Sequence, residues 1–187
     1  LQVISGTEEE VFCDTLILSV GLIPQSELMK KIGIEMDART KSASVDESYQ
    51  TSTEGIFVAG NALQVHDLVD YVSLEAERTA KAIYRYLCER EASEAKTGPE
   101  QNSIRIITDP QIAYSVPQVT KGKNDFVLSF RVKKPLEKVT LFADQDGQIL
   151  YKQRYQKLIP AQLQQINILS KHIISKKDIK LRIEKSI

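Results

Sequence analysis

The sequence of 187 residues lacks most of the features that assign a protein to a class at first sight. It has no tryptophan, only two cysteines and no excess of either charge, with 25 basic against 25 acidic residues. No apolar run approaches the roughly 20 residues that a membrane helix needs, so a membrane span is excluded. A hydrophobic content of 42% excludes wholesale disorder. What remains is a globular chain of one or two domains, whose bulk charge says little about its partners.

The two cysteines, Cys13 and Cys88, are too far apart for a redox dithiol motif and too few for a disulfide scaffold or a metal site. We expect two unpaired thiols and a reducing, cytoplasmic location. A secretory leader is also missing, because nothing near Leu1 resembles a basic segment followed by an apolar one. The absence of an initiator methionine leads us to expect a piece of a longer polypeptide.

The formal net charge of zero is the sum of two halves of the chain with opposite charge. Residues 1–95 hold 17 acidic and 8 basic residues, whereas residues 96–187 hold 8 acidic and 17 basic ones, so the formal charges are −9 and +9. The polar stretch 93–102, which contains Gly98 and Pro99, predicts a linker between two domains. The opposite charges predict that the halves attract each other or an acidic partner.

The first half has the pattern of an α/β domain. An apolar run at 16–20 predicts a strand that is buried on both faces and ends in a turn. A second run of the same kind, at 56–59, ends at Gly60. A short helix over residues 27–32 is predicted between these strands, with Ser26 as its N-cap and a glycine as its stop.

A long helix is predicted over residues 67–91, because apolar residues recur there at spacings of three and four. The apolar positions that define its predicted buried face are Leu68, Val72, Ala76, Ala80, Ile83 and Leu87. Acidic residues at its start, Asp67 and Asp70, have the arrangement of an acidic N-cap.

Beyond the linker, the apolar period changes from 3.6 to 2, which is the period of β-strands. The sequence DQDG at residues 144–147 predicts a hairpin turn. About seven short strands fit into the second half, with the count and spacing of an immunoglobulin-like sandwich. The fold class is therefore predicted as α+β, with an all-β sandwich domain at 103–187.

A small basic cluster lies near the C-terminus, at Lys176, Lys177 and Lys180. Nucleic-acid sites of this kind need aromatic stacking platforms or a helix that reads bases, and neither accompanies the cluster. We interpret these lysines as solvated protection of a sheet edge, and no nucleic-acid partner is predicted.

The most informative segment is TSTEGIFVAGNA at residues 51–62, which leads directly into the long helix. A glycine at 60 lets a ligand approach the backbone, and the side-chain oxygen of Asn61 can accept hydrogen bonds from hydroxyls. The start of the helix presents free N–H groups with positive potential. These residue types suit an anionic or polyhydroxylated ligand, although many α/β strands end in glycine.

Two ordered stretches resemble the C-terminal part of the FAD-dependent pyridine nucleotide-disulfide oxidoreductases. The first is CDTLILSVGLIP at 13–24, which is similar to the end of that family's NAD(P)H-binding domain. The second is SVDESYQTSTEGIFVAGN at 44–61, which is similar to its flavin-contacting motif. The resemblance covers about residues 10–92.

The resemblance implies a partial FAD/NAD(P)-binding α/β remnant ahead of the sandwich. Residues 1–28 would end the NAD(P)H-binding domain, and residues 29–92 would form the C-terminal part of the FAD-binding domain. The implied cofactor is FAD, with NAD(P)H as co-substrate, and hydride would pass from NAD(P)H to FAD and on to an unknown acceptor.

The resemblance also implies the residues that contact the flavin, namely Gly60, Asn61, Leu68, Val69 and Asp70. Position 61 matches an acidic residue that hydrogen-bonds the ribityl chain in the family, whereas this sequence has an asparagine. An amide can still accept a hydrogen bond and can also donate one. The backbone N–H groups of residues 68–70 would face the pyrimidine oxygen of the flavin.

Other parts of the family's machinery are missing from the sequence. None of its eight glycines forms a G-x-G-x-x-G turn, and no close pair of cysteines could form the redox disulfide. No catalytic residue is therefore predicted, and we expect the 187-residue chain alone to be inactive and to retain no FAD. His66 is interpreted as a capping or solvent-facing residue, with a proton relay as the alternative. His172 is interpreted as structural.

The sequence leaves more than one function open. The leading interpretation is a portion of a flavoprotein oxidoreductase. The family ends in many members with a mixed α/β dimerisation domain, and the all-β second half departs from it. The alternative is therefore an interaction module, in which the sandwich docks a partner subunit or a second copy of the chain. A free-standing regulatory α/β protein is a third interpretation.

Overall fold

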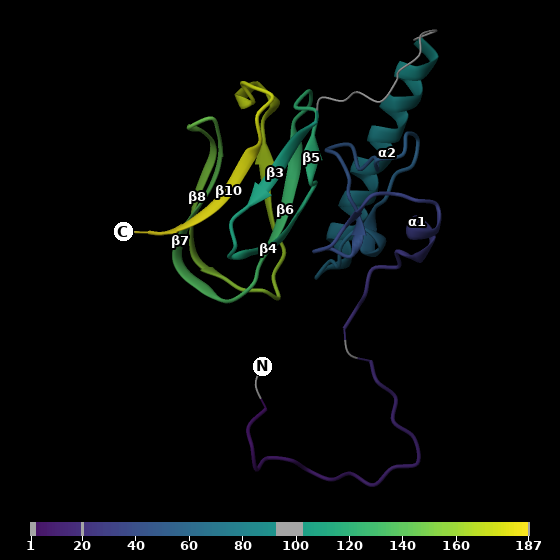
Figure 1. Ribbon diagram of the computed structural model, residues 1–187, viewed down its shortest axis with the longest axis vertical. Coiled ribbons are helices and arrows are strands. Elements are labelled where there is room, and N and C mark those ends of the chain that lie inside the picture. The colour runs from purple at the N-terminus through teal and green to yellow at the C-terminus, as the bar shows by residue number, and fades with distance from the viewer. Residues whose placement is uncertain (1–2, 20, 93–102, 187) are drawn as a thin grey trace.

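The computed structural model describes residues 3–19, 21–92 and 103–186. An extended N-terminal segment leads into a small α/β part, and a two-sheet β-structure follows (Figure 1). The predicted linker, 93–102, lies outside the described residues. No helix among the described residues is long and apolar enough to cross a membrane.

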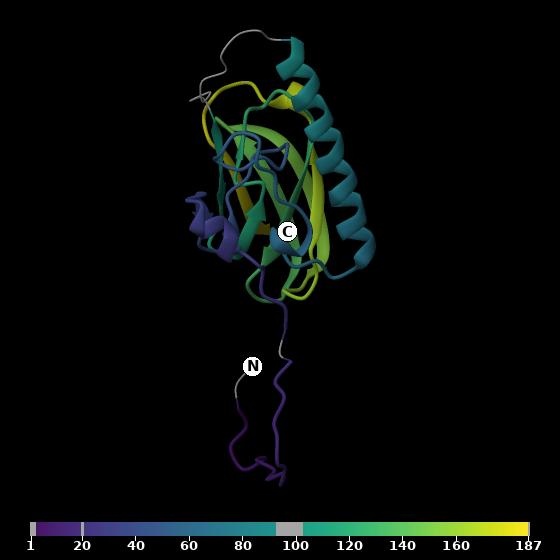
Figure 2. The ribbon, with the colours of Figure 1, turned by 90° about the vertical axis from the view of Figure 1, so that its right-hand side faces the viewer.

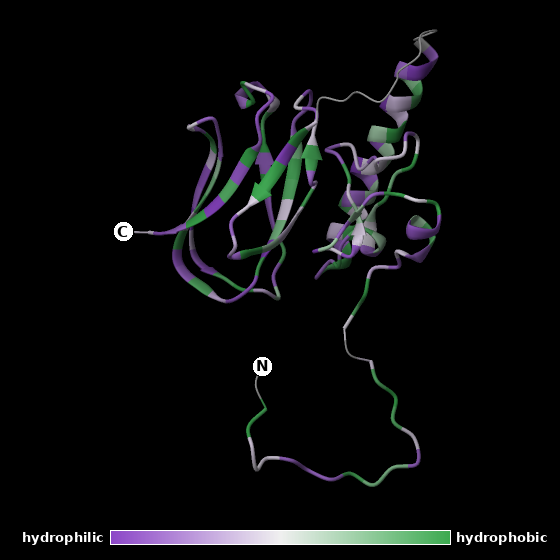
Figure 3. Cartoon of the chain, in the orientation of Figure 1, coloured by the Kyte–Doolittle hydropathy of each residue, from purple (hydrophilic) through white to green (hydrophobic). Residues whose placement is uncertain are grey.

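The N-terminal segment, residues 3–19, is extended and lies away from the folded body (Figures 1 and 2). The strand predicted at 16–20 is wrong over its described part, because Leu16, Ile17 and Leu18 are 74%, 85% and 75% exposed. Figure 3 shows apolar stretches along this exposed segment. A strand buried on both faces needs neighbouring strands and covering layers, and the described residues supply neither here.

The first helix, α1 (Glu27–Lys31), forms where it was predicted. Ser26 occupies its N-cap position, but the hydroxyl makes no capping hydrogen bond, so that part of the prediction is wrong. The chain turns after the helix at Gly33, whose φ of +77° lies in the left-handed region that glycine adopts without strain.

Irregular backbone fills most of the segment between α1 and the long helix. Its only ladder is formed by β1 (Met36–Asp37) and β2 (Ser42–Ala43), which pair antiparallel. The strand predicted at 56–59 is also wrong, because only an isolated bridge between Gln50 and Phe57 forms there. Its apolar residues still pack inward, in a small core whose buried members are Met29, Ile34, Ala43, Val45, Tyr49, Val58, Leu63 and Val116.

The long helix, α2 (Val69–Ala92), has close to its predicted length. Its buried face is rotated from the predicted one and contains Glu75, Thr79 and Ala82. Most of the predicted apolar face is instead exposed at Leu68, Ala76, Ala80 and Leu87. Spacing alone predicts that a helix has an apolar face, but the neighbouring elements determine which face they cover.

The second half consists of strands in two sheets, with a 3₁₀ turn at Ser170–His172. The larger sheet has the order β5-β3-β10-β7-β8, and the smaller one has the order β4-β6-β9. The strands are β3 (Ile104–Thr108), β4 (Ile112–Val116), β5 (Val119–Thr120), β6 (Phe126–Val132), β7 (Leu136–Gln145), β8 (Gln148–Leu158), β9 (Gln164–Ile168) and β10 (Ile179–Lys185).

One apolar core lies between the two sheets. Alternate residues of β6, such as Leu128 and Phe130, contribute to it together with Leu141 and Leu181 from the larger sheet. This alternation agrees with the predicted period of two. The predicted hairpin turn forms at Asp146 and Gly147, which both have positive φ values, as a tight two-residue hairpin requires. The α+β class is confirmed in its mixed composition, whereas the immunoglobulin-like assignment stays a prediction.

The α/β part packs on the smaller sheet and shares its core with it through Val116. Val45 and Gln118 exchange two hydrogen bonds across the boundary. The N–H of Val45 donates to Gln118 Oε1 over 3.0 Å, and the N–H of Gln118 donates to the Val45 carbonyl over 3.1 Å. The two halves of unlike charge are therefore in direct contact within one molecule.

Candidate functional site

The turn that carries the candidate ligand-binding residues is a short 3₁₀ helix at Gly60–Ala62, which lies just before α2. Gly60 is buried and has a φ of +65°. A Cβ at this position would lie 3.4 Å from Val72 Cγ1 on the first turn of α2. That distance is an ordinary van der Waals contact, so the positive φ, and not a clash with α2, is what favours glycine at this position.

Asn61, the next residue, is exposed on the surface of this turn. Its Oδ1 atom accepts a hydrogen bond from the backbone N–H of His66 over 3.1 Å. The side-chain amide nitrogen has no partner among the described residues, so it is available to donate to a ligand. One side-chain group thus orders the loop, while the other faces outward.

The remaining candidate residues lie at the start of α2. Leu68 and Val69 are 56% and 76% exposed, and Asp70 is exposed in the first helical turn. The first N–H groups of a helix have no intrahelical acceptors and carry positive potential. The start of α2 therefore combines exposed apolar side chains with donor groups, which is a surface suited to a planar ligand with polar edges.

A buried carboxylate, that of Glu75, holds the turn and the helix together. One of its oxygens, Oε1, accepts a hydrogen bond from the Gly60 N–H over 2.7 Å and lies 3.1 Å from His66 Nε2. The other, Oε2, accepts a hydrogen bond from Gln64 Nε2 over 2.8 Å. Glu75 is only 1% exposed, so these contacts replace water around a buried charge.

The interpretation of His66 as capping or solvent-facing is wrong. Its side chain is fully buried against Glu75, and its Nδ1 atom has no hydrogen-bond partner in the part of the chain that the structure describes. Sequence reasoning also missed Glu75 and Gln64. The available signal was that residues 72, 75, 79 and 82 form a helical face of their own, but this face is too polar to stand out by hydropathy.

Asp67 connects the loop to the β-sandwich instead of capping α2. Its carboxylate accepts a hydrogen bond from Arg131 Nη2, which also donates to the Val65 carbonyl over 2.9 Å. The second oxygen of Asp67 accepts from the Leu163 N–H over 2.5 Å. Arg131 donates further to the Tyr114 hydroxyl over 2.8 Å. These bonds fix the segment between the turn and α2 from the side of the sandwich.

No group of three or more histidine, cysteine, aspartate or glutamate side chains is placed to hold a metal ion in the described part of the chain. Cys13 and Cys88 are free and exposed, as expected for unpaired thiols. The site therefore consists of the turn, the start of α2 and the buried carboxylate beneath them.

Comparison with known proteins relates the N-terminal part of the chain to a redox family. Residues 1–83 match the family model described as pyridine nucleotide-disulphide oxidoreductase. The chain is 29% identical over 90 residues to the glutamate synthase [NADPH] small chain of Halomonas elongata, an alignment that covers 46% of this chain and 19% of that protein. It is 26% identical over 132 residues to the dihydrolipoyl dehydrogenase of Mycoplasma genitalium, which covers 67% of this chain and 27% of that protein.

The chain thus spans about a fifth to a quarter of the length of these curated relatives. No solved structure gives a significant match.

Proposed function

We propose that this chain supplies one wall of an FAD site in a larger NAD(P)H-dependent flavoprotein, because residues 1–83 match the family model described as pyridine nucleotide-disulphide oxidoreductase. In that protein, hydride passes from NAD(P)H to FAD and on to an acceptor. The observation that carries the proposal is the placement of Gly60 and Asn61 directly beside the start of α2, held there by Glu75.

The residues present fit a flavin nucleotide. The amide nitrogen of Asn61, which has no partner among the described residues, can donate to a ribityl hydroxyl or a diphosphate oxygen. An amide also places no negative charge beside the diphosphate. The N–H groups at the start of α2 stabilise negative charge on the pyrimidine side of a reduced flavin. FAD, when bound, supplies the hydride-accepting ring.

The exposed apolar side of α2 is consistent with this proposal. Ala76 and Leu87 are exposed apolar residues of α2 that no described element covers, and Leu16, Ile17 and Leu18 are a second uncovered apolar set. Both sets lie in the family-related part or directly beside it. We infer that the remaining portions of the FAD and NAD(P)H domains cover them in the larger protein.

The first test is an absorption spectrum. The 187-residue chain, purified, mixed with excess FAD and passed through a desalting column, is expected to show no flavin band near about 450 nm. The glycine-rich turns that bind the diphosphate in the family are absent from its sequence, so the chain lacks the main diphosphate contacts of an FAD site. The complete flavoprotein, treated in the same way, serves as the positive control. A flavin band that stays with the 187-residue chain would overturn the expectation, and its absence from both proteins would overturn the proposed function.

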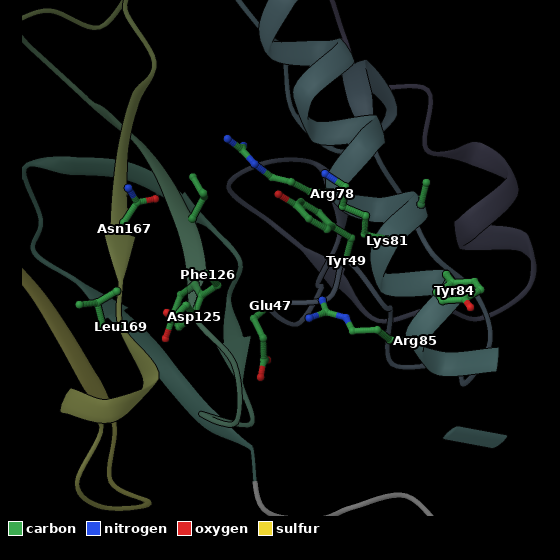
Figure 4. Close-up of a pocket in the computed structure, with 12 residues that line it drawn as sticks. Glu47, Tyr49, Arg78, Lys81, Tyr84, Arg85, Asp125, Phe126, Asn167 and Leu169 are labelled. Atoms are coloured by element: carbon green, nitrogen blue, oxygen red, sulfur yellow. The ribbon is translucent and has the colours of Figure 1, made fainter. Parts of the chain in front are cut away.

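A second candidate function is docking of a partner subunit by the β-sandwich. It is favoured by a groove of about 900 Å³ between α2 and the smaller sheet (Figure 4).

Removal of residues 100–187 from the complete flavoprotein separates these two roles. Association with the partner is expected to be lost. Turnover with NADH and a dye acceptor is expected to fall but to persist, because the candidate flavin contacts lie outside the sandwich, whereas Arg131 and Gln118, which hold the α/β part from the sandwich side, are removed. The measurements are steady-state dye reduction and analytical size-exclusion chromatography. Loss of turnover in a variant that still binds FAD would instead make the sandwich part of the active architecture.

A further inference from the structure

The groove between α2 and the smaller sheet has two chemically different walls. The wall formed by α2 carries three cations, Arg78, Lys81 and Arg85. The facing wall is formed by β6, the end of β9 and the residues beside them, and it offers Val127 and Leu169 together with the polar Asp125 and Asn167. Figure 4 shows the side chains of Arg78 and Arg85 between the helix and the facing strands. Cations on one wall and apolar side chains on the other suit an amphipathic occupant.

Arg85 is the cation of this wall that is most available to an occupant. It has no ion pair or hydrogen bond to any described residue, and Lys81 has only an exposed pair with Glu77 at 4.0 Å. Arg78 lies beside the Tyr49 hydroxyl. Burial raises the pKa of Tyr49 to about 12, an effect that Arg78 opposes, so the phenol stays neutral at physiological pH.

Two carboxylates, Glu47 and Asp125, also line the groove, but neither forms an ion pair with Arg78, Lys81 or Arg85 among the described residues. Glu47 accepts hydrogen bonds from the Lys121 N–H over 2.9 and 3.0 Å. Asp125 accepts from the Ser170 N–H over 2.7 Å and from its hydroxyl over 2.8 Å. Both are therefore already bound to groups of the sandwich, while the α2 cations face the groove.

The spacing of the cations favours an extended chain over a compact anion. Arg78 and Arg85 are seven residues apart, which is about 10 Å along a helix axis. A single phosphate or carboxylate cannot contact both ends of such a row. Side chains on one side of an extended peptide repeat every 7 Å or so, and can meet the row in sequence while the alternate side chains face Val127 and Leu169.

We propose that this groove docks an extended segment of a partner protein in which acidic and apolar residues alternate. The segment lies along α2 with its carboxylates on Lys81 and Arg85 and its apolar residues on the smaller sheet. This inference rests on the second candidate function, docking by the sandwich, and it adds the surface and the chemistry of the partner.

The probe for this proposal is a fluorescein-labelled ten-residue peptide of alternating glutamate and valine, titrated against the 187-residue chain and followed by fluorescence anisotropy. We expect saturable binding that weakens as salt increases, because surface ion pairs are screened. Two reference peptides contain serine in place of valine, or lysine in place of glutamate. Both are expected to bind at least tenfold more weakly.

The matched variants reverse charge inside and outside the groove. Lys81→Glu combined with Arg85→Glu is expected to weaken the glutamate–valine peptide at least tenfold, whereas Lys157→Glu on β8 leaves its affinity unchanged. Far-UV circular dichroism of each variant confirms folding. Equal loss in Lys157→Glu, equal binding of the serine peptide, or complete displacement by millimolar inorganic phosphate would each overturn the proposal, and so would no binding at all.

Docking at this groove and docking elsewhere on the sandwich predict different results for the complete flavoprotein. If the Lys81→Glu and Arg85→Glu changes leave partner association of the complete flavoprotein intact, while removal of residues 100–187 abolishes it, docking occurs elsewhere on the sandwich and the groove is not the site.

Discussion

Replacing Glu75 with alanine is expected to lower the free energy of unfolding of the α/β part by about 3–5 kcal/mol. Its carboxylate is the acceptor for the Gly60 N–H and for Gln64 Nε2, and all of these groups are buried. Each buried donor left without an acceptor costs about 1–3 kcal/mol. Urea unfolding followed by circular dichroism measures the total, and hydrogen exchange of the Gly60 amide reports the local effect.

The same helix supplies a control for this prediction. Glu77 is exposed two residues further on and has only a 4.0 Å pair with Lys81, so Glu77→Ala is expected to change stability by less than about 0.5 kcal/mol. Glu75→Gln keeps one acceptor oxygen and should fall between the two variants. If Glu75→Ala unfolds within about 1 kcal/mol of the unchanged protein, the carboxylate is not the centre of the network.

A weakened network has a consequence for the proposed flavin site. Gly60 would lose the acceptor that holds it beside Val72, and Asn61 belongs to the same turn. In the complete flavoprotein, Glu75→Ala is therefore expected to reduce FAD affinity along with stability. Glu77→Ala should leave FAD affinity unchanged, which separates the effect from a general loss of helix charge.

Elements that depend on local signals were predicted well from the sequence. The helix α2 has a long periodic pattern, and α1 is followed by a glycine with positive φ. In the sandwich, alternation of apolar residues identified most of the strands, and the Asp146–Gly147 turn identified the longest hairpin. The helices and the β7–β8 hairpin draw their hydrogen bonds from residues that are close in sequence. Other strands, such as β3 and β10, pair across long stretches of sequence and were found from the alternation of their apolar residues.

Elements that need distant partners were predicted poorly. The apolar runs at 16–20 and 56–59 have the composition of buried strands, yet neither forms one among the described residues. A parallel strand gains its hydrogen bonds from neighbours that are remote in sequence. The rotated face of α2 has the same origin, because the elements that pack against Glu75 and Ala82 determine which side is buried.

In the candidate site, too, residues that form one contiguous motif were predicted, whereas contacts between separate segments were not. Gly60 and Asn61 were found because the motif that contains them is contiguous. The buried contact between His66 and Glu75 was not found, since it joins a loop to a polar helix face across nine residues. No hydropathy pattern distinguishes a buried glutamate from a solvated one. The burial of Glu75 becomes clear only in the structure, where the buried N–H of Gly60 needs an acceptor and Glu75 supplies it.

The second large effect is expected at Arg131, the residue through which the sandwich holds the loop before α2. Arg131→Met keeps most of the aliphatic stem but removes the guanidinium donors to Asp67, to the Val65 carbonyl and to the Pro160 carbonyl. The Arg131 side chain is only 12% exposed, so water replaces these bonds incompletely. We expect a loss of about 2–4 kcal/mol in unfolding free energy.

The readout that identifies Arg131 as a bridge is hydrogen exchange on both sides of the boundary. Amides near Val65 in the loop and Leu163 in the sandwich should exchange faster together, because Asp67 binds both Arg131 and the Leu163 N–H. Arg154→Met, an exposed substitution on β8, is the control and should alter neither. A double-mutant cycle with Asp67→Asn should give a coupling energy of about 1–2 kcal/mol. Faster exchange confined to the sandwich would contradict the bridging role, because the loop would then be held by its own contacts to Glu75.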